Sequence, residues 1–117
     1  MQIGHIEIFV RDIAAARRFY VDVLGCTHHH PQMEHVAWLT LGDVTLLLRP
    51  GRVADGVEAY AGSHTATVLY TDDLDATMAG LTERGLTFRG TDGSDRCPTF
   101  TDPDGNWFQL VNPQEMS

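Results

Sequence analysis

The sequence predicts an α+β fold of two tandem βαβββ units, whose strands form a curved mixed sheet shaped like a cup. Near the start of the chain, a strand-like alternation leads directly into a capped helix, and this order returns about 60 residues later. Two short apolar strands joined by a tight turn close each unit. We therefore expect a single domain over 1–117, with unit one at about 1–50, a link at about 51–62 and unit two at about 63–113.

The first unit begins with alternation over Ile3–Val10, which is strand periodicity with one purely apolar face. Asp12 then offers an N-cap to a helix over Ile13–Leu24, and Gly25 supplies its C-terminal stop. Two further strands are predicted at Val36–Leu41 and Val44–Arg49, with a tight turn between them.

The second unit repeats this order after a link that has no sustained periodicity. A strand over His64–Thr71 is followed by a helix that Asp72 or Asp73 caps and that Gly85 ends. Three more strands complete the unit, at Leu86–Arg89, Cys97–Thr101 and Asn106–Val111.

The composition excludes several classes of protein. A net charge of -8 would repel the phosphates of nucleic acid and of an anionic membrane surface. No segment approaches the roughly 20 apolar residues of a membrane span, and the start lacks the features of a secretion signal. Cys26 and Cys97 are isolated, so we expect both thiols to be reduced. The prediction is a cytoplasmic protein with no nucleic-acid or membrane partner.

Two histidines mark the face of the sheet that we predict to be functional. His5 and His64 lie in the first predicted strand of each unit, and we expect them at equivalent positions facing one cavity. Both belong to the strand face opposite the apolar one. A surface role is the alternative for a lone histidine, but two in a repeat favour a shared site.

Three segments of the chain resemble the vicinal oxygen chelate superfamily, which includes glyoxalase I, extradiol dioxygenases, fosfomycin resistance enzymes and bleomycin resistance proteins. They are IGHIEIFVRDIAAARRFYVDVLG, GSHTATVLYTDDLDATMAGLTERGL and TFTDPDGNWFQLVNP. The resemblance covers nearly the whole chain and implies the glyoxalase/bleomycin resistance/dioxygenase fold. It also implies a small-molecule substrate or a drug as the partner.

In the metal-dependent branches of that superfamily, the ligand positions correspond here to His5, Leu47, His64 and Gln109. Leu47 cannot bind a metal, but branches that use two His and one Glu do without that ligand. The Glu position is Gln109 here, and a carboxamide oxygen can coordinate a divalent ion less strongly. The resemblance therefore implies a divalent metal, Fe, Mn, Zn or Ni, at His5, His64 and Gln109.

Glu7 lies one pleat from His5 on the same strand face, so we expect it to act as a general base or to bring a carboxylate to the ion. A solvated surface acid is the alternative. The other residues predicted to line the substrate site are Trp38, Thr45, Leu47, Arg49, Cys97, Thr99 and Trp107. By contrast, we interpret the tract His28, His29 and His30 with His35 as a surface feature, because adjacent strand residues point to opposite faces.

Three functions remain open from the sequence. The first is a metal-dependent lyase, isomerase or dioxygenase that acts on two neighbouring substrate oxygens. The second is a metal-free protein of the bleomycin resistance type, which sequesters a drug or metabolite and so confers antibiotic resistance, and the acidic charge would suit a cationic ligand. The third is a regulatory or structural subunit with a relict site. The resemblance also implies a homodimer with sites shared between chains, and two retained histidines favour the metal enzyme narrowly.

Overall fold

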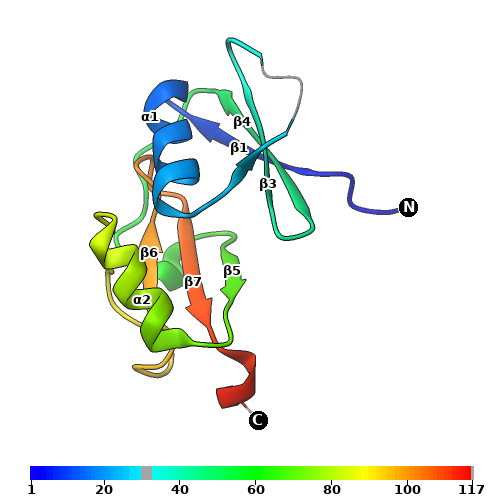
Figure 1. The fold of residues 1–117 in the computed structure, drawn as a ribbon. Helices are drawn as coiled ribbons and strands as arrows, with labels where there is room; N and C mark the ends of the chain where they lie inside the picture. The colour runs from blue at the N-terminus through cyan, green and yellow to red at the C-terminus, as the bar shows by residue number, and fades with distance from the viewer. Residues whose placement is uncertain (30–32, 117) are drawn as a thin grey trace. The chain divides into compact units, whose positions relative to one another are not determined.

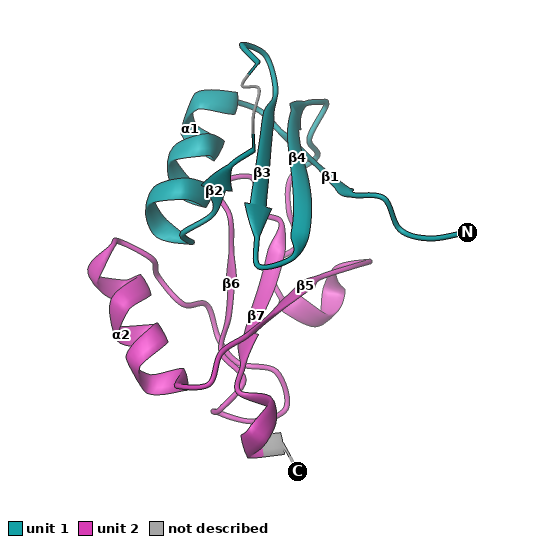
Figure 2. Cartoon of the chain, turned by 45° about the vertical axis from the view of Figure 1, so that its right-hand side comes forward, with its two compact units in different colours: residues 1–54 teal, residues 55–117 magenta. Residues whose placement is uncertain are grey.

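The computed structural model describes residues 1–29 and 33–116 of the chain. Contacts divide it into two compact units, residues 1–54 and residues 55–117 (Figure 2). The boundary falls inside the predicted link, whose later residues belong to the second unit. Each unit holds one mixed sheet and one α-helix (Figure 1), which confirms the predicted α+β class.

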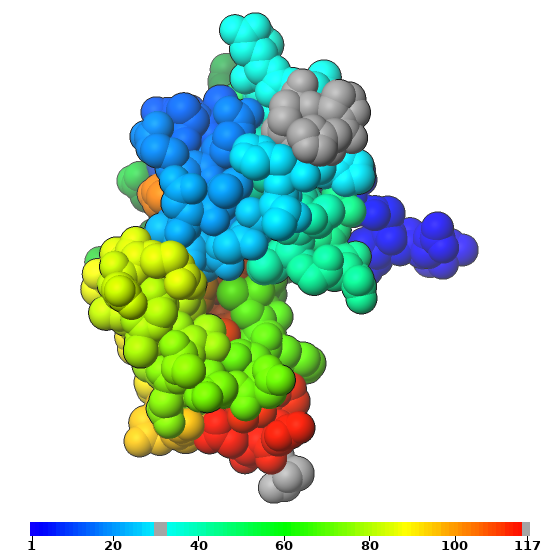
Figure 3. Space-filling view, viewed as in Figure 1, coloured from blue at the N-terminus to red at the C-terminus, as the bar shows by residue number. Residues whose placement is uncertain are grey.

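The sheet of unit 1 has the strand order β1-β4-β3-β2. Its strands are β1 (Ile6–Val10), β2 (Thr27–His28), β3 (Ala37–Leu41) and β4 (Val44–Pro50). The first strand runs parallel to β4, and the other neighbouring pairs are antiparallel. The predicted βαβββ order is therefore confirmed for this unit. The first residues of the chain project away from the rest of unit 1 (Figure 3), and Ile3 among them is 85% exposed.

Helix α1 (Ile13–Arg18) continues as a π-helical turn, η1 (Phe19–Val23), so the predicted single helix changes its winding after Arg18. Asp12 caps it by accepting hydrogen bonds from the amides of Ala14 and Ala15 at 3.0 and 3.2 Å. Gly25 ends it with a φ of +84°, which an L side chain rarely adopts. Its apolar face packs on the sheet around Ile8, Val10, Ala16, Tyr20, Ala37, Leu39, Leu46 and Leu48.

The sheet of unit 2 has the order β5-β7-β6. Its strands are β5 (Thr67–Tyr70), β6 (Thr99–Thr101) and β7 (Trp107–Val111). Here too the first strand of the unit runs parallel to the last. Helix α2 (Leu74–Glu83) follows β5, and two short 3-10 helices, η2 (Tyr60–Gly62) and η3 (Pro113–Met116), lie near the two ends of the unit.

The prediction of a strand over Leu86–Arg89 is wrong, because these residues, all of them described, form no regular strand. This segment forms only a partial connection to β6, in which the Arg89 amide donates to the Thr99 carbonyl at 2.7 Å and the Thr99 amide donates to the Gly90 carbonyl at 3.0 Å. Gly85 and Gly90, which both have positive φ, flank the segment directly and interrupt a regular ladder at its two ends.

The core of unit 2 is built on stacked aromatic rings. The ring centroids of Phe100 and Phe108 lie 5.1 Å apart, and the ring planes meet at an angle of 4°. Both side chains are almost fully buried. Arg96 ties the periphery together, because it donates to Asp75 at the start of α2 and to Glu115 in η3, each at 2.8 Å. These hydrogen bonds lower the pKa of both carboxyl groups. Within the described residues, no helix has the length and apolar character of a membrane span.

Gly56 provides a test of the packing in unit 2. A Cβ at this position would lie 3.1 Å from the Gly105 Cα and 3.2 Å from its carbonyl oxygen, so the Gly105 backbone would have to shift to admit it. We expect Gly56→Ala to lower the free energy of unfolding by about 1–3 kcal/mol. Gly62→Ala is the control, because its Cβ would make ordinary contacts at 3.6 Å with the Val57 side chain. Equal stability of the two variants in denaturant titrations would contradict this packing.

Candidate functional site

A network of charged side chains lies on the face of the unit 1 sheet opposite α1. The Nε2 atom of His5 lies 3.0 Å from Oε2 of Glu7, and the Arg49 guanidinium donates to the other Glu7 oxygen at 2.9 Å. The ring of Trp38 meets the His5 ring edge-on, with centroids 4.8 Å apart. Four of the residues predicted from the sequence are therefore brought together.

Strand pairing explains this arrangement. Glu7 pairs with Leu47 across the parallel β1–β4 ladder, and Leu47 pairs in turn with Trp38 across the β3–β4 hairpin. Side chains two residues apart on a strand share a face, so His5 and Arg49 flank this row on the same side. Leu47 is 7% exposed, while about a third of the His5 and Glu7 side-chain surfaces is exposed. The row therefore has an apolar floor and an accessible polar rim.

Glu7 is held in its charged form. Its hydrogen bond with His5 and the one from Arg49 lower the pKa of the carboxyl group below its ordinary value. Arg49 also lies over the Phe9 ring, with the guanidinium carbon 5.5 Å from the ring centroid. A carboxylate that is already ionised and oriented can orient the His5 imidazole or receive a cationic group of a ligand.

On the corresponding face of unit 2, strand β7 is covered by the unit's own chain. The Trp107 indole donates to the Val57 carbonyl at 3.0 Å, and the Gln109 amide donates to the Tyr60 hydroxyl at 2.9 Å. Trp107 and Gln109 are consequently only 3% and 9% exposed. The segment that contains Val57 and Tyr60 thus lies over β7, the central strand of this sheet.

The remaining predicted lining residues differ in accessibility. Thr45 is partly exposed on the open face of unit 1. Thr99 is 1% exposed and donates its hydroxyl to the Arg89 carbonyl at 2.8 Å, and Cys97 is 2% exposed in the loop before β6. Cys26 is buried as well, and burial raises the pKa of its thiol to about 11, so it is not a nucleophile at neutral pH.

The structure overturns the expected equivalence of His5 and His64. His5 lies two residues before Glu7, which pairs with Leu47, whereas the residue two before the partner of Gln109 is Ala66. The helix caps give the same answer, because Asp12 follows His5 by seven residues and Asp73 follows Ala66 by seven. His64 lies in the exposed chain before β5, where strand alternation does not govern its direction.

The register also decides how well the residues fit a metal ion. The positions equivalent to a four-ligand centre hold His5, Leu47, Ala66 and Gln109. Only two neutral donors remain, without a carboxylate to balance the charge of a divalent ion. Residues 1–29 and 33–116 include no group of three His, Cys, Asp or Glu side chains arranged to hold a metal. This donor set does not fit the metal centre implied by the resemblance.

The sequence analysis missed Tyr60, Asp92 and Arg89 in unit 2. Tyr60 is the only aromatic residue of the predicted link, which was the one available signal. Arg89 lies over the Trp107 ring at 4.8 Å from the centroid. In the histidine tract, the His29 ring lies 6.5 Å from that of Trp38, while His35 is exposed and His30 lies outside the described residues.

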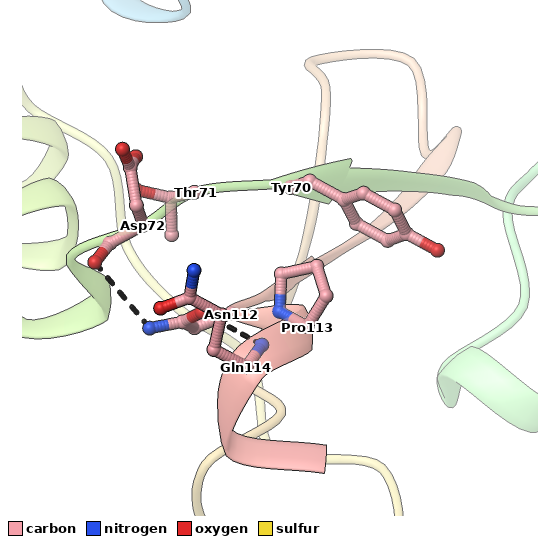
Figure 4. Close-up of a pocket in the computed structure, with 6 residues that line it drawn as sticks. All are labelled: Tyr70, Thr71, Asp72, Asn112, Pro113 and Gln114. Carbon is pink, nitrogen blue, oxygen red and sulfur yellow. Dashed lines mark hydrogen bonds between the residues drawn. The ribbon is translucent and has the colours of Figure 1, made fainter. Parts of the chain in front are cut away.

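A separate shallow pocket of about 320 Å³ lies at the C-terminal ends of the parallel strands β5 and β7. Its lining residues are Tyr70, Thr71, Asp72, Asn112, Pro113 and Gln114. In Figure 4 the Tyr70 ring and the Asp72 carboxylate extend toward opposite ends of this pocket. None of these residues belongs to the predicted site.

Comparison with known proteins identifies the family. The family model of the Glyoxalase/Bleomycin resistance protein/Dioxygenase superfamily matches residues 2–110, so the chain belongs to this superfamily. No curated protein sequence matches the chain.

Solved structures agree with this fold. A fosfomycin resistance protein from Mesorhizobium loti is 18% identical with a TM-score of 0.70, covering 99% of this chain and 98% of its own. A lactoylglutathione lyase from Agrobacterium tumefaciens is 17% identical with a TM-score of 0.69, covering 98% and 96%. A superfamily member from Sphaerobacter thermophilus is 27% identical with a TM-score of 0.65, covering 96% and 98%.

The Glu7 network predicts a dependence of stability on pH. A carboxyl group whose pKa is lowered by folding stabilises the native state above its unfolded pKa of about 4.5, and the contribution is lost as the pH falls through the lower folded value. Glu7→Gln is therefore expected to be slightly less stable than the wild type at pH 7, and this gap should narrow as the pH falls below about 4.5. Thermal unfolding across this range measures the difference, and a constant gap would contradict the network.

Proposed function

We propose that this chain is a small-molecule-binding protein of the superfamily whose ligand lies on the open face of unit 1, independently of a bound metal. The observation that carries the proposal is the strand register, which leaves His5 as the sole imidazole among the four family ligand positions. The open face retains features suited to an organic ligand, with Trp38 as an aromatic wall and Leu47 as an apolar floor.

The chemistry of the face favours a planar ligand that carries positive charge. An aromatic ring contributes stacking energy to a planar partner, and the ionised Glu7 carboxylate offers an acceptor at the rim. The net charge of -8 raises the local concentration of cations around the protein. Arg49 and His5 hold Glu7 in place, so the acceptor is oriented before the ligand arrives.

A metal-dependent enzyme that acts on a substrate with neighbouring oxygens is the second candidate. It retains His5, His64 and Gln109 as proposed ligands and Glu7 as the proposed base. The observation in its favour is that the His5 nitrogen and the Glu7 oxygen converge to 3.0 Å, so an imidazole and a carboxylate face the same point. The position of His64, two residues from equivalence, weighs against it.

Ligand titrations with and without chelator distinguish the two candidates. With a panel of planar organic cations, we expect a change in tryptophan fluorescence that persists in EDTA. In calorimetric titrations, which do not depend on Trp38 emission, Trp38→Ala should weaken this binding about ten-fold through loss of the aromatic wall. His35→Ala is the control, because its side chain is 85% exposed. Binding that requires added Mn²⁺ or Zn²⁺ and disappears in His5→Ala would contradict the proposal and support the metal enzyme. A panel that gives no response also contradicts it.

We propose further that the chain forms a homodimer with sites shared between chains. Strands β1 and β5 each lie at one edge of their sheet. Each strand carries exposed apolar side chains. On β1, Ile6 is 40% and Phe9 47% exposed, and on β5, Val68 is 45% and Tyr70 74% exposed. Apolar edges of this kind are uncommon on monomers and suit association with a second copy.

Molar mass from light scattering at micromolar concentration tests this association. The wild-type chain is expected at twice the mass of one chain, and Val68→Lys is expected to shift the population toward the monomer by placing a charge at the edge. Val44→Lys is the matched control, since Val44 is 48% exposed on β4, an internal strand of its sheet. A monomeric wild-type chain, or a Val68→Lys variant that remains dimeric, would refute the proposed interface.

A further inference from the structure

Unit 2 contains a hydrogen-bonding cluster that a metal-binding role for Gln109 does not explain. The Gln109 side-chain nitrogen lies 2.9 Å from the Tyr60 hydroxyl oxygen and 3.4 Å from Oδ2 of Asp92. A carboxylate only accepts hydrogen bonds, so the nitrogen of the amide must face Asp92. The amide oxygen of Gln109 is therefore directed away from both neighbours.

Two hydrogen-bonding functions are left over in this cluster. The Tyr60 hydroxyl accepts from Gln109, which leaves its own proton to donate. The Gln109 side-chain oxygen can accept two hydrogen bonds. Across the described residues, none of the observed hydrogen bonds uses either function. The Tyr60 hydroxyl proton and the Gln109 side-chain oxygen are consequently both available to a ligand.

The surroundings of the cluster form an apolar wall that is fixed in place. The Tyr60 and Trp107 rings meet edge to face at 6.1 Å, and Trp107 is held by its hydrogen bond to the Val57 carbonyl. Arg89 covers the Trp107 ring and donates to Thr101, so its charge is engaged. Partly buried hydrogen-bonding groups beside rigid aromatic rings are typical of ligand subsites.

We propose that Tyr60 and Gln109 form a subsite for a neutral cis-amide, such as a lactam or an amide edge of a heterocycle. The ligand N–H donates to the Gln109 oxygen, and the ligand carbonyl accepts from the Tyr60 hydroxyl. Asp92 is a positioning residue, because it fixes which way the Gln109 amide points. The subsite lies wholly within unit 2 and does not rest on the proposed ligand face of unit 1.

The probe for this subsite is 2-pyrrolidinone, with N-methyl-2-pyrrolidinone as the analogue that lacks the donor. In a Trp38→Phe background, tryptophan fluorescence comes from Trp107 alone. We expect 2-pyrrolidinone to change this emission with a dissociation constant on the order of millimolar, as suits so small a ligand. The N-methyl analogue should bind about five-fold more weakly, since the hydrogen bond to Gln109 cannot form.

Two variants separate recognition from folding. Tyr60→Phe retains the ring contact with Trp107 but removes the donor, and should weaken binding about five-fold. Asp92→Ala should weaken binding by about two- to five-fold with an unchanged melting temperature, because Asp92 is exposed and acts on the orientation of Gln109. Asp95→Ala, which removes an exposed carboxylate from the same loop, is the control and should bind like the parent.

The same titrations can overturn the subsite. No response to 2-pyrrolidinone, equal binding of the N-methyl analogue, or parental affinity in both Tyr60→Phe and Asp92→Ala would each refute it. Because Trp38, the aromatic wall of the unit 1 face, is absent from this background, failure here leaves the proposed function of unit 1 unaffected. Equally, loss of cation binding in the wild type would leave the lactam result standing.

Discussion

Parallel pairing between the first and the last strand of each unit is the constraint on which the arrangement of side chains depends. In β1 and β4 it sets Glu7 beside Leu47, and in β5 and β7 it sets Val68 beside Gln109. Because strand side chains alternate between faces, one such pairing decides the face of every residue in both strands. The helix that joins the strands can then cover only the apolar face.

The two units have the same frame but use their second face differently. In unit 1 that face stays accessible and carries a chain of hydrogen bonds from His5 through Glu7 to Arg49. In unit 2 the chain itself covers this face over β7, with Tyr60 bound to Gln109. A polar residue on a covered face must find partners within the protein, whereas one on an open face can exchange them with a ligand.

Local signals made much of the fold predictable. The caps at Asp12 and Asp73 and the stops at Gly25 and Gly85 are short-range features, and the helices occupy the expected places. The start of β5 is not a local property, since it depends on where pairing with β7 begins. For that reason the sequence predicted the face of His5 and its neighbours Glu7, Trp38 and Arg49, but misplaced His64. Tyr60 and Asp92 join the cluster through contacts 49 and 17 residues away in sequence, which periodicity cannot detect.

The chemistry at position 109 follows from these neighbours. A glutamate there would set a second carboxylate against Asp92, and neither could donate to the other at neutral pH. Glutamine has nearly the same shape and is neutral, and its nitrogen can supply protons to both Tyr60 and Asp92. The amide is thus the side chain that satisfies this cluster. The same amide offers a divalent ion a neutral oxygen in place of a carboxylate, so the side chain that satisfies the local hydrogen bonds is also the weaker metal ligand.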